Sequence, residues 1–383
     1  MNKVERAKAL YPFLLENLHL SPAEFILKYK SKLGDEIQFG ASQLNGMRKA
    51  KKKLPTWFEN DAILYPPNLN LEQSSSELTS IYKRQFFKGL KSSVDLTGGF
   101  GVDSWAIAQE AKEHTYVEPN TELLEIVKSN TSAFKIQNLK FNNSIAEDWL
   151  DKDATVEAIY LDPSRRVEGQ KKFILTECVP DVVTLQNVML KNAQKVLIKL
   201  SPLADLKAIH TQLKNVSEIH VVAVKNEVKE LLVLQCFTEL DEPIIKTINY
   251  RSTEETDCFS FLLSQEQSTQ VGMSAVKTFI YEPNAAILKA GAFKLLASRM
   301  GLRKLHANTH LYTSDEQVKA FPGRVFKLNI SQPKKVNIIA RNHPLKPKEI
   351  AKKYKVKEGA KDDFLLAFRD IEKPKICYCK LLN

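Results

Sequence analysis

The sequence predicts an α/β protein, in which a doubly wound parallel sheet follows a helical N-terminal region and precedes small α+β domains. Three observations support this fold class. Between residues 92 and 239, short apolar runs typical of buried strands alternate with helical segments. Residues 1–60 show the three- and four-residue apolar spacing of helices. Beyond residue 240 the pattern changes to shorter strands and helices.

The N-terminal region, residues 1–72, is expected to be helical. Apolar side chains between residues 10 and 18 recur on one helix face. Ser21-Pro22-Ala23-Glu24 combines a capping serine, a first-turn proline and a glutamate, which together start a second helix. A basic run at residues 48–53 closes a third helix, and its default interpretation is a solvated face.

The central region is expected to form the parallel sheet. Strands are predicted at residues 93–96, 114–117, 140–142, 158–161 and 195–200, followed by a terminal antiparallel pair at 218–224 and 230–237. In such a sheet the carboxyl ends of the strands face the ligand crevice. Residues that directly follow these strands are therefore the candidates for a binding site.

The loop after the first strand, Thr97-Gly98-Gly99-Phe100-Gly101, is rich in glycine. A helix start, a second strand and Glu118 follow it in order. Strand, glycine loop, helix, strand and acid make up a nucleoside-binding βαβ unit. The glycines let the backbone approach the ligand, and the acid accepts hydrogen bonds from ribose hydroxyls. The alternative is a tight glycine turn with an unrelated glutamate further on.

The spacing around this loop distinguishes between nucleosides. Asp95 begins the pattern Asp-x-x-x-Gly-x-Gly, which ends with Gly99 and Gly101 and differs from the dinucleotide pattern Gly-x-Gly-x-x-Gly. A phosphate-binding P-loop is not present either, because no Gly-Lys-Ser/Thr follows a glycine loop. The loop resembles motif I of the class I S-adenosylmethionine (AdoMet)-dependent methyltransferases, with Thr97 where many members carry the first glycine. Asp95 suits a ligand that bears an amine and a positive sulfur.

The fourth strand ends in Asp162-Pro163-Ser164-Arg165-Arg166, and Lys199 lies at the end of the fifth. Methyltransferases that act on amino groups commonly carry Asp/Asn-Pro-Pro-aromatic at this point, and the resemblance implies that Asp162 orients the acceptor beside the methyl group. This chain departs from that pattern: Ser164 replaces the second proline, and two arginines replace the aromatic residue. The double arginine suits a phosphate or carboxylate of the substrate. The alternative is that the arginines pair with structural acids such as Glu168 or Glu177.

These motifs, with the closing block from Ala340-Arg341-Asn342 to Lys357-Glu358-Gly359, are similar to bacterial class I methyltransferases that carry a C-terminal THUMP-like domain with a ferredoxin-like domain between. The resemblance covers most of the chain from Gln73 onward. It implies a methyltransferase domain at 73–240, a small α+β ferredoxin-like domain at 241–320 and a basic THUMP-like domain at 321–383.

The resemblance also implies roles for individual residues. The cofactor AdoMet would contact Asp95, Thr97, Gly99, Phe100, Gly101, Asp103, Glu118, Pro119 and Ala146. The catalytic position would be formed by Asp162, Pro163 and Ser164, and the substrate would be held by Arg165, Arg166 and Lys199. THUMP domains bind RNA, so the resemblance implies an RNA substrate.

The distribution of charge agrees with a polyanionic partner. The net charge is +11 over 383 residues. Residues 1–91 carry 15 Lys and Arg against 9 Asp and Glu, residues 92–320 carry 25 against 30, and residues 321–383 carry 16 against 6. Basic segments on either side of a mildly acidic core suit RNA. The alternative is an ordinary solvated, lysine-rich surface.

Five scattered cysteines suggest reduced thiols and a cytoplasmic protein. Cys377 and Cys379 share a strand face, where packing is a better explanation than a metal site. No apolar run approaches the ~18 residues of a membrane span, and the charged N-terminus does not resemble a signal peptide. We therefore expect neither a metal nor a membrane partner.

The sequence as a whole predicts an AdoMet-dependent methyltransferase that modifies rRNA or tRNA. Two alternatives stay open. One is an RNA-binding or assembly protein that retains an AdoMet-binding fold, and the other is a methyltransferase for a protein or a small molecule. The target nucleotide, the modified atom and the oligomeric state do not follow from the sequence.

Overall fold

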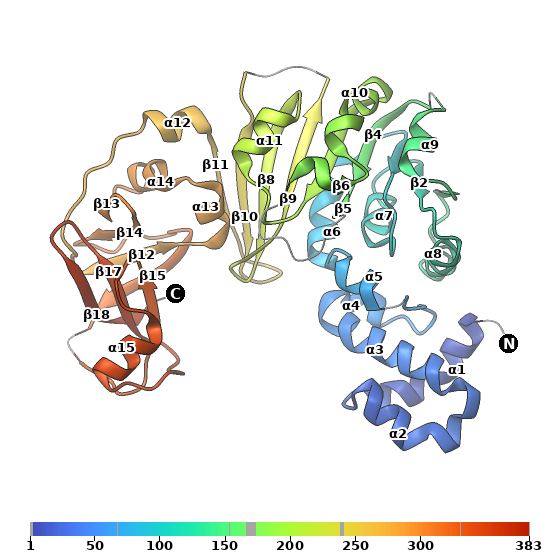
Figure 1. Ribbon diagram of the computed structural model, residues 1–383, viewed down its shortest axis with the longest axis horizontal. Coiled ribbons are helices and arrows are strands. Elements are labelled where there is room, and N and C mark those ends of the chain that lie inside the picture. The colour runs from blue at the N-terminus through green and yellow to red at the C-terminus, as the bar shows by residue number, and fades with distance from the viewer. Residues whose placement is uncertain are drawn as a thin grey trace. The chain divides into compact units, whose positions relative to one another are not determined.

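The computed structural model describes residues 3–66, 68–152, 154–165, 174–237, 241–329 and 331–382 (Figure 1). The chain forms two compact units. The first comprises Met1–Asn215 with Val233–Glu239, and the second comprises Val216–Leu232 with Leu240–Asn383. None of the helices in the described ranges combines the length and the apolar character that a bilayer crossing requires.

The first unit begins with helices, as the sequence predicts. They are α1 (Lys3–Glu16), α2 (Pro22–Leu33), η1 (Gly34–Glu36), α3 (Ile37–Lys53), α4 (Pro55–Phe58), α5 (Asn68–Gln73), α6 (Glu77–Lys83) and η2 (Arg84–Phe86), drawn in blue shades in Figure 1. The start of α2 has the predicted capping box. Ser21 Oγ accepts a hydrogen bond from the Glu24 N–H at 3.3 Å, and the Glu24 carboxylate accepts one from the Ser21 N–H at 2.7 Å. These bonds satisfy N–H groups that the first helical turn leaves unpaired.

An extended segment at residues 63–66 follows these helices, and two side-chain amides hold it as a neighbouring strand would. Gln43 Nε2 donates to the Tyr65 carbonyl and Gln43 Oε1 accepts from the Tyr65 N–H, both at 3.0 Å. Asn130 makes the same pair of bonds to Leu64, at 2.8 and 2.9 Å. Because Asn130 belongs to α8 (Thr121–Ala133), this segment links the N-terminal helices to the layer that covers the sheet.

The first sheet has nine strands in the order β11-β10-β8-β9-β7-β4-β1-β2-β3. Their bounds are β1 (Ser93–Asp95), β2 (His114–Val117), β3 (Leu139–Asn142), β4 (Val156–Leu161), β7 (Ala193–Leu200), β8 (Val216–Val224), β9 (Glu227–Cys236), β10 (Ile244–Tyr250) and β11 (Thr256–Leu262). The pairs β1–β2, β1–β4, β2–β3 and β4–β7 are parallel. The expected doubly wound α/β fold is therefore confirmed.

Helices and short segments connect these strands. They are α7 (Val102–Ile107), α8 (Thr121–Ala133), α9 (Ala146–Leu150), η3 (Leu175–Glu177), α10 (Val182–Asn192) and α11 (Leu206–Gln212), with a separate two-stranded sheet of β5 (Ser164–Arg165) and β6 (Cys178–Val179). Strands β8 and β9 are joined by the two-residue turn Lys225-Asn226, in which both residues have positive φ, as a tight hairpin requires.

The structure places residues 244–262 differently from the sequence-based expectation of a separate small domain. They form β10 and β11 at the edge of the first sheet, with β10 parallel to β8 and antiparallel to β11. Ile245 and Phe261 are partners across β10 and β11 and are both buried, which gives this strand pair the apolar face that a position at the edge of a sheet needs. The sequence pattern shows that a strand is present but does not show which sheet it joins.

The second sheet has seven strands in the order β13-β14-β12-β15-β18-β17-β16. Its elements are α12 (Leu263–Ser268), β12 (Phe279–Pro283), α13 (Ala285–Ala290), α14 (Phe293–Arg299), β13 (Arg303–His306), β14 (Thr309–Ser314), β15 (Gly323–Leu328), β16 (Asn337–Arg341), α15 (Pro347–Tyr354), β17 (Asp363–Arg369) and β18 (Pro374–Leu381). Strand β12 pairs with both β14 and β15. Residues on both sides of the expected boundary at 320 and 321 therefore belong to one sheet and share one apolar core.

The N-terminal helices also share a core with the loop after β1. Phe100 is 2% exposed, and its ring lies 4.9 Å from the ring of Trp57, measured between centroids. Val102 and Ile126 belong to the same cluster of buried residues. The helical region thus supports the glycine loop from behind, within the first unit.

Candidate cofactor and acceptor site

The candidate site lies where the strand order of the first sheet changes direction, between β1 and β4. The chain runs from β1 outward to β2 and β3, and then returns to β4 on the other side of β1. At such a point, the carboxyl ends of parallel strands border a ligand crevice. The glycine loop follows β1, Glu118 follows β2, Asp162 follows β4, and Lys199 is the penultimate residue of β7.

Three glycines shape the loop, each for a different reason. A Cβ on Gly98 would lie 2.2 Å from the ring of Tyr116, and a Cβ on Gly101 would lie 2.6 Å from Val127. Gly99 and Gly101 have φ values of +53° and +78°, a conformation that glycine adopts most readily. At Gly99 the nearest atom to an added Cβ, the Thr97 carbonyl oxygen, is 3.7 Å away. Gly99 is thus the glycine of this loop whose missing side chain leaves room for a ligand.

Glu118 connects the loop after β1 with the end of β2. Its Oε2 accepts a hydrogen bond from the Gly99 N–H at 3.0 Å, and its Oε1 accepts one from the Asn120 N–H at 2.9 Å. Partial burial raises the pKa of this carboxyl group. Each carboxylate oxygen can accept a second bond, so Glu118 retains capacity for ligand hydroxyls. The neighbouring Pro119 is exposed.

Asp95 lies below the loop, 1% exposed. Its Oδ1 accepts hydrogen bonds from the N–H and Oγ1 of Thr97 at 3.0 and 3.3 Å, and its Oδ2 accepts one from Ser104 Oγ at 2.7 Å. Ser104 Oγ also lies 3.2 Å from His114 Nε2, and His114 Nδ1 lies 2.8 Å from Ser93 Oγ. Burial raises the pKa of Asp95 to about 7. In this structure Asp95 positions the loop and the start of α7, and its contact with a ligand stays a prediction.

Asp103 is the centre of a buried charged cluster that the sequence did not suggest. Its Oδ1 lies 3.0 Å from Lys83 Nζ, and its Oδ2 accepts hydrogen bonds from Ser75 Oγ and Tyr160 Oη, both at 2.7 Å. Burial acts to raise the pKa of Asp103, but the charges of Lys83 and Lys199 and the hydrogen bonds from Ser75 and Tyr160 outweigh it and lower the pKa. Asp103 therefore stays ionised, which fixes α6 against the carboxyl end of β4.

Asp162 and Lys199 form an ion pair at the adjacent ends of β4 and β7. The backbone N–H of Asp162 donates to Thr97 Oγ1 at 2.6 Å. Thr97, the residue that departs from the glycine of the related motif, thus links the loop after β1 to the acceptor position. The structure brings together two residues that the sequence predicted for catalysis and substrate binding.

Lys53, from the basic run at the end of α3, also belongs to this site. Its Nζ donates to the carbonyls of Leu71 and Glu72, both at 2.8 Å. Burial and the charge of Lys199 lower the pKa of Lys53 to about 8. The run was expected to be a solvated face, and no local pattern marks Lys53 as different from its neighbours.

Other predicted site residues have mainly structural surroundings. Phe100 packs inward against Trp57, and Ala146 is a buried residue at the first position of α9. Pro163 is buried, whereas Ser164 is exposed, with its Oγ donating to the Val179 carbonyl at 3.4 Å. The roles proposed for these residues stay predictions.

The double arginine is only partly within the described structure. Arg165 is in β5, where its backbone is paired with Cys178 of β6. Arg166 and Glu168 lie outside the described residues. In the part of the chain that the structure describes, no group of three or more histidine, cysteine, aspartate or glutamate side chains is arranged to hold a metal ion.

Comparisons with known proteins identify the class. A model of a ferredoxin-like domain matches residues 279–322, and a model described as THUMP domain-like matches residues 316–380. Together with the doubly wound sheet and its glycine loop, they define a class I methyltransferase fold with C-terminal ferredoxin-like and THUMP-like domains. No curated protein matches the sequence.

The family is shown by a solved structure described as a "putative methyltransferase from Porphyromonas gingivalis". It is 31% identical to this chain, covers 99% of both chains and has a TM-score of 0.87. The chain belongs to the same family, the bacterial class I AdoMet-dependent methyltransferases that carry a C-terminal THUMP-like domain.

Two more distant structures match only part of the chain. An rRNA methylase from Streptococcus thermophilus is 13% identical over 42% of this chain and 95% of its own, with a TM-score of 0.32. A Streptococcus mutans structure, described as a "putative methyltransferase" in complex with SAH, is 13% identical over 41% of this chain and 94% of its own, with a TM-score of 0.31. At these scores neither match supports a functional argument.

Proposed function

We propose that this protein transfers a methyl group from AdoMet to RNA, with rRNA or tRNA as the substrate class. The observation that carries the proposal is the meeting of four strand ends in the first unit. The open loop position Gly99, the half-buried Glu118 and the ion pair of Asp162 with Lys199 all lie at the carboxyl ends of these strands, in a member of a family of methyltransferases.

The residues at the ends of β1 and β2 suit AdoMet. Gly99 leaves space above the loop, and Glu118 has oxygens that can accept hydrogen bonds from both ribose hydroxyls. The buried start of α9 at Ala146 offers backbone groups for the adenine. AdoMet supplies an activated methyl group on a positive sulfur, so the protein mainly has to bind, orient and exclude water.

The residues at the ends of β4 and β7 suit the acceptor. Lys199 holds one carboxylate oxygen of Asp162, which leaves the other to accept a hydrogen bond from the acceptor group. The Asp162 N–H is fixed by Thr97, so the carboxylate is oriented before the substrate arrives. Asp162 is therefore the proposed orienting residue, and Lys199 positions it.

Charge supports RNA as the substrate. The segment from residue 321 to 383 carries 16 Lys and Arg against 6 Asp and Glu, and the match to the THUMP-like model, residues 316–380, covers most of it. Lys53 adds positive charge near Lys199, whose own charge is paired with Asp162. A polyanion gains affinity from such a distribution by the release of its counterions.

The test begins with calorimetric titration of AdoMet into the full-length protein, with NAD as the control ligand. RNA from cells that lack the gene is then incubated with the protein and AdoMet labelled at the methyl group, and its modified nucleosides are compared with those of wild-type cells. A labelled nucleoside that is absent from the deletion strain supports the proposal. AdoMet binding with label transferred only to protein or small molecules would replace RNA as the substrate, and binding without any turnover would favour an RNA-binding protein that retains the fold.

A further inference from the structure

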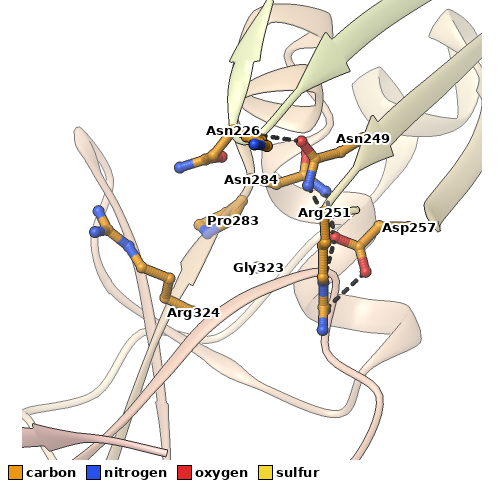
Figure 2. Close-up of a pocket in the computed structure, with 9 residues that line it drawn as sticks. Asn226, Asn249, Arg251, Asp257, Pro283, Asn284, Gly323 and Arg324 are labelled. Carbon is orange, nitrogen blue, oxygen red and sulfur yellow. Dashed lines mark hydrogen bonds and ion pairs between the residues drawn. The ribbon is translucent and has the colours of Figure 1, made fainter. Parts of the chain in front are cut away.

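A cavity lies within the second unit and shares no lining residue with the candidate cofactor and acceptor site. Its volume is about 400 Å³. It is bordered by the β8–β9 turn, the end of β10, the start of β11, the junction of β12 with α13 and the start of β15 (Figure 2). Pockets that hold small ligands and nucleotides usually measure about 300–1,000 Å³.

The carboxylate on the wall of this cavity, Asp257, is neutralised by its neighbours. Arg251 binds both of its oxygens, with Nε to Oδ2 at 3.0 Å and Nη2 to Oδ1 at 2.7 Å. The amides of Asn249 and Asn284 also donate to Oδ2, at 3.1 and 3.4 Å. Figure 2 shows these bonds converging on Asp257. The carboxylate therefore has little capacity to attract a further cation or to repel an anion.

Arg324, on the side of the cavity opposite Asp257 in Figure 2, contributes positive charge. It pairs with Glu282, which is 3% exposed and which also binds Arg341. Two guanidinium groups thus share one buried carboxylate, and one positive charge remains in excess. The exposed Lys225 in the β8–β9 turn adds another.

Asn226 fixes the shape of the wall between these cations. Its Oδ1 accepts a hydrogen bond from the Ala285 N–H at 2.7 Å, and its N–H donates to Asn249 Oδ1 at 3.1 Å. The side chain is therefore held with its Nδ2 group pointing away from Asn249, on the side of Arg324 in Figure 2. Gly323 forms part of the base, where a Cβ would lie 2.1 Å from the Glu282 carbonyl oxygen. Hydrogen bonds at Asn226 and close backbone packing at Gly323 thus fix the shape of this part of the wall.

We propose that this cavity binds the phosphate of a nucleotide, and that in the cell the nucleotide is part of the bound RNA. The assignment of RNA as the source rests on the proposed function above; the phosphate chemistry does not. Lys225 and Arg324 supply the charge, arginine matches phosphate oxygens with paired donors, and the Asn226 amide supplies a neutral donor between them. A volume of about 400 Å³ exceeds what a phosphate alone would fill, so there is space for the attached nucleoside.

Asn226→Asp is the most direct test because it keeps the acceptor for Ala285 and adds one negative charge to the wall. Aspartate also tolerates the positive φ of 63° at this position. The full-length variant is titrated against a fluorescent 20-nucleotide oligouridine. We expect affinity to fall about tenfold, because a phosphate beside a like charge is disfavoured. Lys225→Gln should reduce the slope of log K against log salt by about 0.7, the value for one lost phosphate contact on a single strand.

The matched control is Asn308→Asp, which adds the same charge on an exposed turn of the second unit outside the cavity. It should bind oligouridine within twofold of the wild type. Thermal unfolding midpoints equal to the wild type establish that each variant is folded. Wild-type affinity in both Asn226→Asp and Lys225→Gln would overturn the proposal while leaving the proposed methyl transfer to RNA intact.

A titration with uridine 5′-monophosphate separates the two proposals. If the wild-type protein binds no oligouridine but binds the mononucleotide, and Asn226→Asp abolishes that binding, the phosphate site stands and RNA fails as its source. If the wild-type protein binds neither probe, the phosphate site is overturned. If it methylates RNA and the cavity variants do so with unchanged KM, the phosphate site is likewise overturned.

Discussion

Replacing Asp95 with asparagine should stabilise the first unit at neutral and alkaline pH. The carboxylate is 1% exposed below the glycine loop, and its hydrogen-bond donors are Thr97 and Ser104. An amide at this position keeps the acceptor for the Thr97 N–H and donates to Ser104 Oγ. Ser104 can then donate to His114 Nε2, and His114 Nδ1 to Ser93, so the direction of the chain reverses and each of these side chains keeps a hydrogen-bond partner.

The magnitude follows from the pKa of Asp95. Burial raises it from an ordinary 3.8 to about 7, which corresponds to about 4 kcal/mol of the free energy of unfolding. The native state binds the proton more tightly than the unfolded chain. The contribution of Asp95 to the free energy of unfolding is therefore fully present below about pH 4 and falls as the pH rises toward 7. Above that pH it no longer changes. Roughly 2.7 kcal/mol of this loss should occur between pH 5 and pH 8.

The assay is urea denaturation of wild type and Asp95→Asn at pH 5 and pH 8, followed by tryptophan fluorescence. All three tryptophans, Trp57, Trp105 and Trp149, belong to the first unit, so the signal reports its unfolding. Other groups titrate over this range, and the informative quantity is the difference between the two proteins. That difference should increase by roughly 2.7 kcal/mol from pH 5 to pH 8 in favour of the variant.

A control and a spectroscopic measurement sharpen the test. Asp151→Asn, at an exposed position, should leave the pH dependence of the wild type unchanged. Burial lowers the pKa of His114 to about 3, so its ring is neutral at both pH values. At pH 8 its nitrogen chemical shifts should show the proton on Nε2 in the wild type and on Nδ1 in Asp95→Asn. Parallel stability profiles for the two proteins would show that burial does not penalise the Asp95 carboxylate, and the argument would fail.

Three further predictions concern the site. Glu118→Ala should weaken AdoMet binding by about 1.5–3 kcal/mol, because it removes a charged hydrogen-bond acceptor, and an unchanged Kd in calorimetry would remove its ribose role. Asp162→Ala should abolish methyl transfer while AdoMet affinity stays nearly intact, because the carboxylate acts on the acceptor. Full turnover by Asp162→Ala would refute the acceptor role. Lys199→Met should lower kcat, because it releases the Asp162 carboxylate from its ion pair. Lys83→Met should destabilise the first unit by about 3–5 kcal/mol, because it leaves the buried Asp103 without its cation. Adding Asp103→Asn to this variant should recover most of the lost stability. A urea midpoint of Lys83→Met equal to that of the wild type would contradict a buried ion pair.

Much of the local structure could be predicted from the sequence. The capping box at Ser21, the glycine loop after β1 and the strands that precede Glu118 and Asp162 all occur where the sequence placed them. Each depends on residues within a few positions of one another. A cap bonds across one helical turn, a buried strand needs an uninterrupted apolar run, and positive φ favours glycine. The doubly wound sheet then brings the strand ends together because parallel strands share an edge.

The membership of the sheets was decided only by tertiary structure. Residues 244–262 have the alternation of an ordinary strand pair, yet they extend the first sheet, and the second sheet continues across residue 320. A deletion from Phe321 onward, which the charge distribution suggests, would remove β15, β18, β17 and β16, which are four contiguous strands on one side of that sheet, and would leave β12 without its partner there. Strand pairing depends on backbone groups far apart in the chain, so the local pattern of apolar residues does not determine it.

The electrostatics of the site were also decided by tertiary structure. Lys53 belongs to the basic run that the sequence predicted as a solvated face, Lys83 had no predicted role, and Phe100 was predicted to contact the cofactor. In the fold, Lys83 is buried against Asp103, Lys53 has a pKa lowered to about 8, and Phe100 completes the helical core. A charged side chain can be buried only where an opposite charge or several hydrogen-bond partners compensate it. Those partners come from distant segments, and only the folded chain brings them within reach.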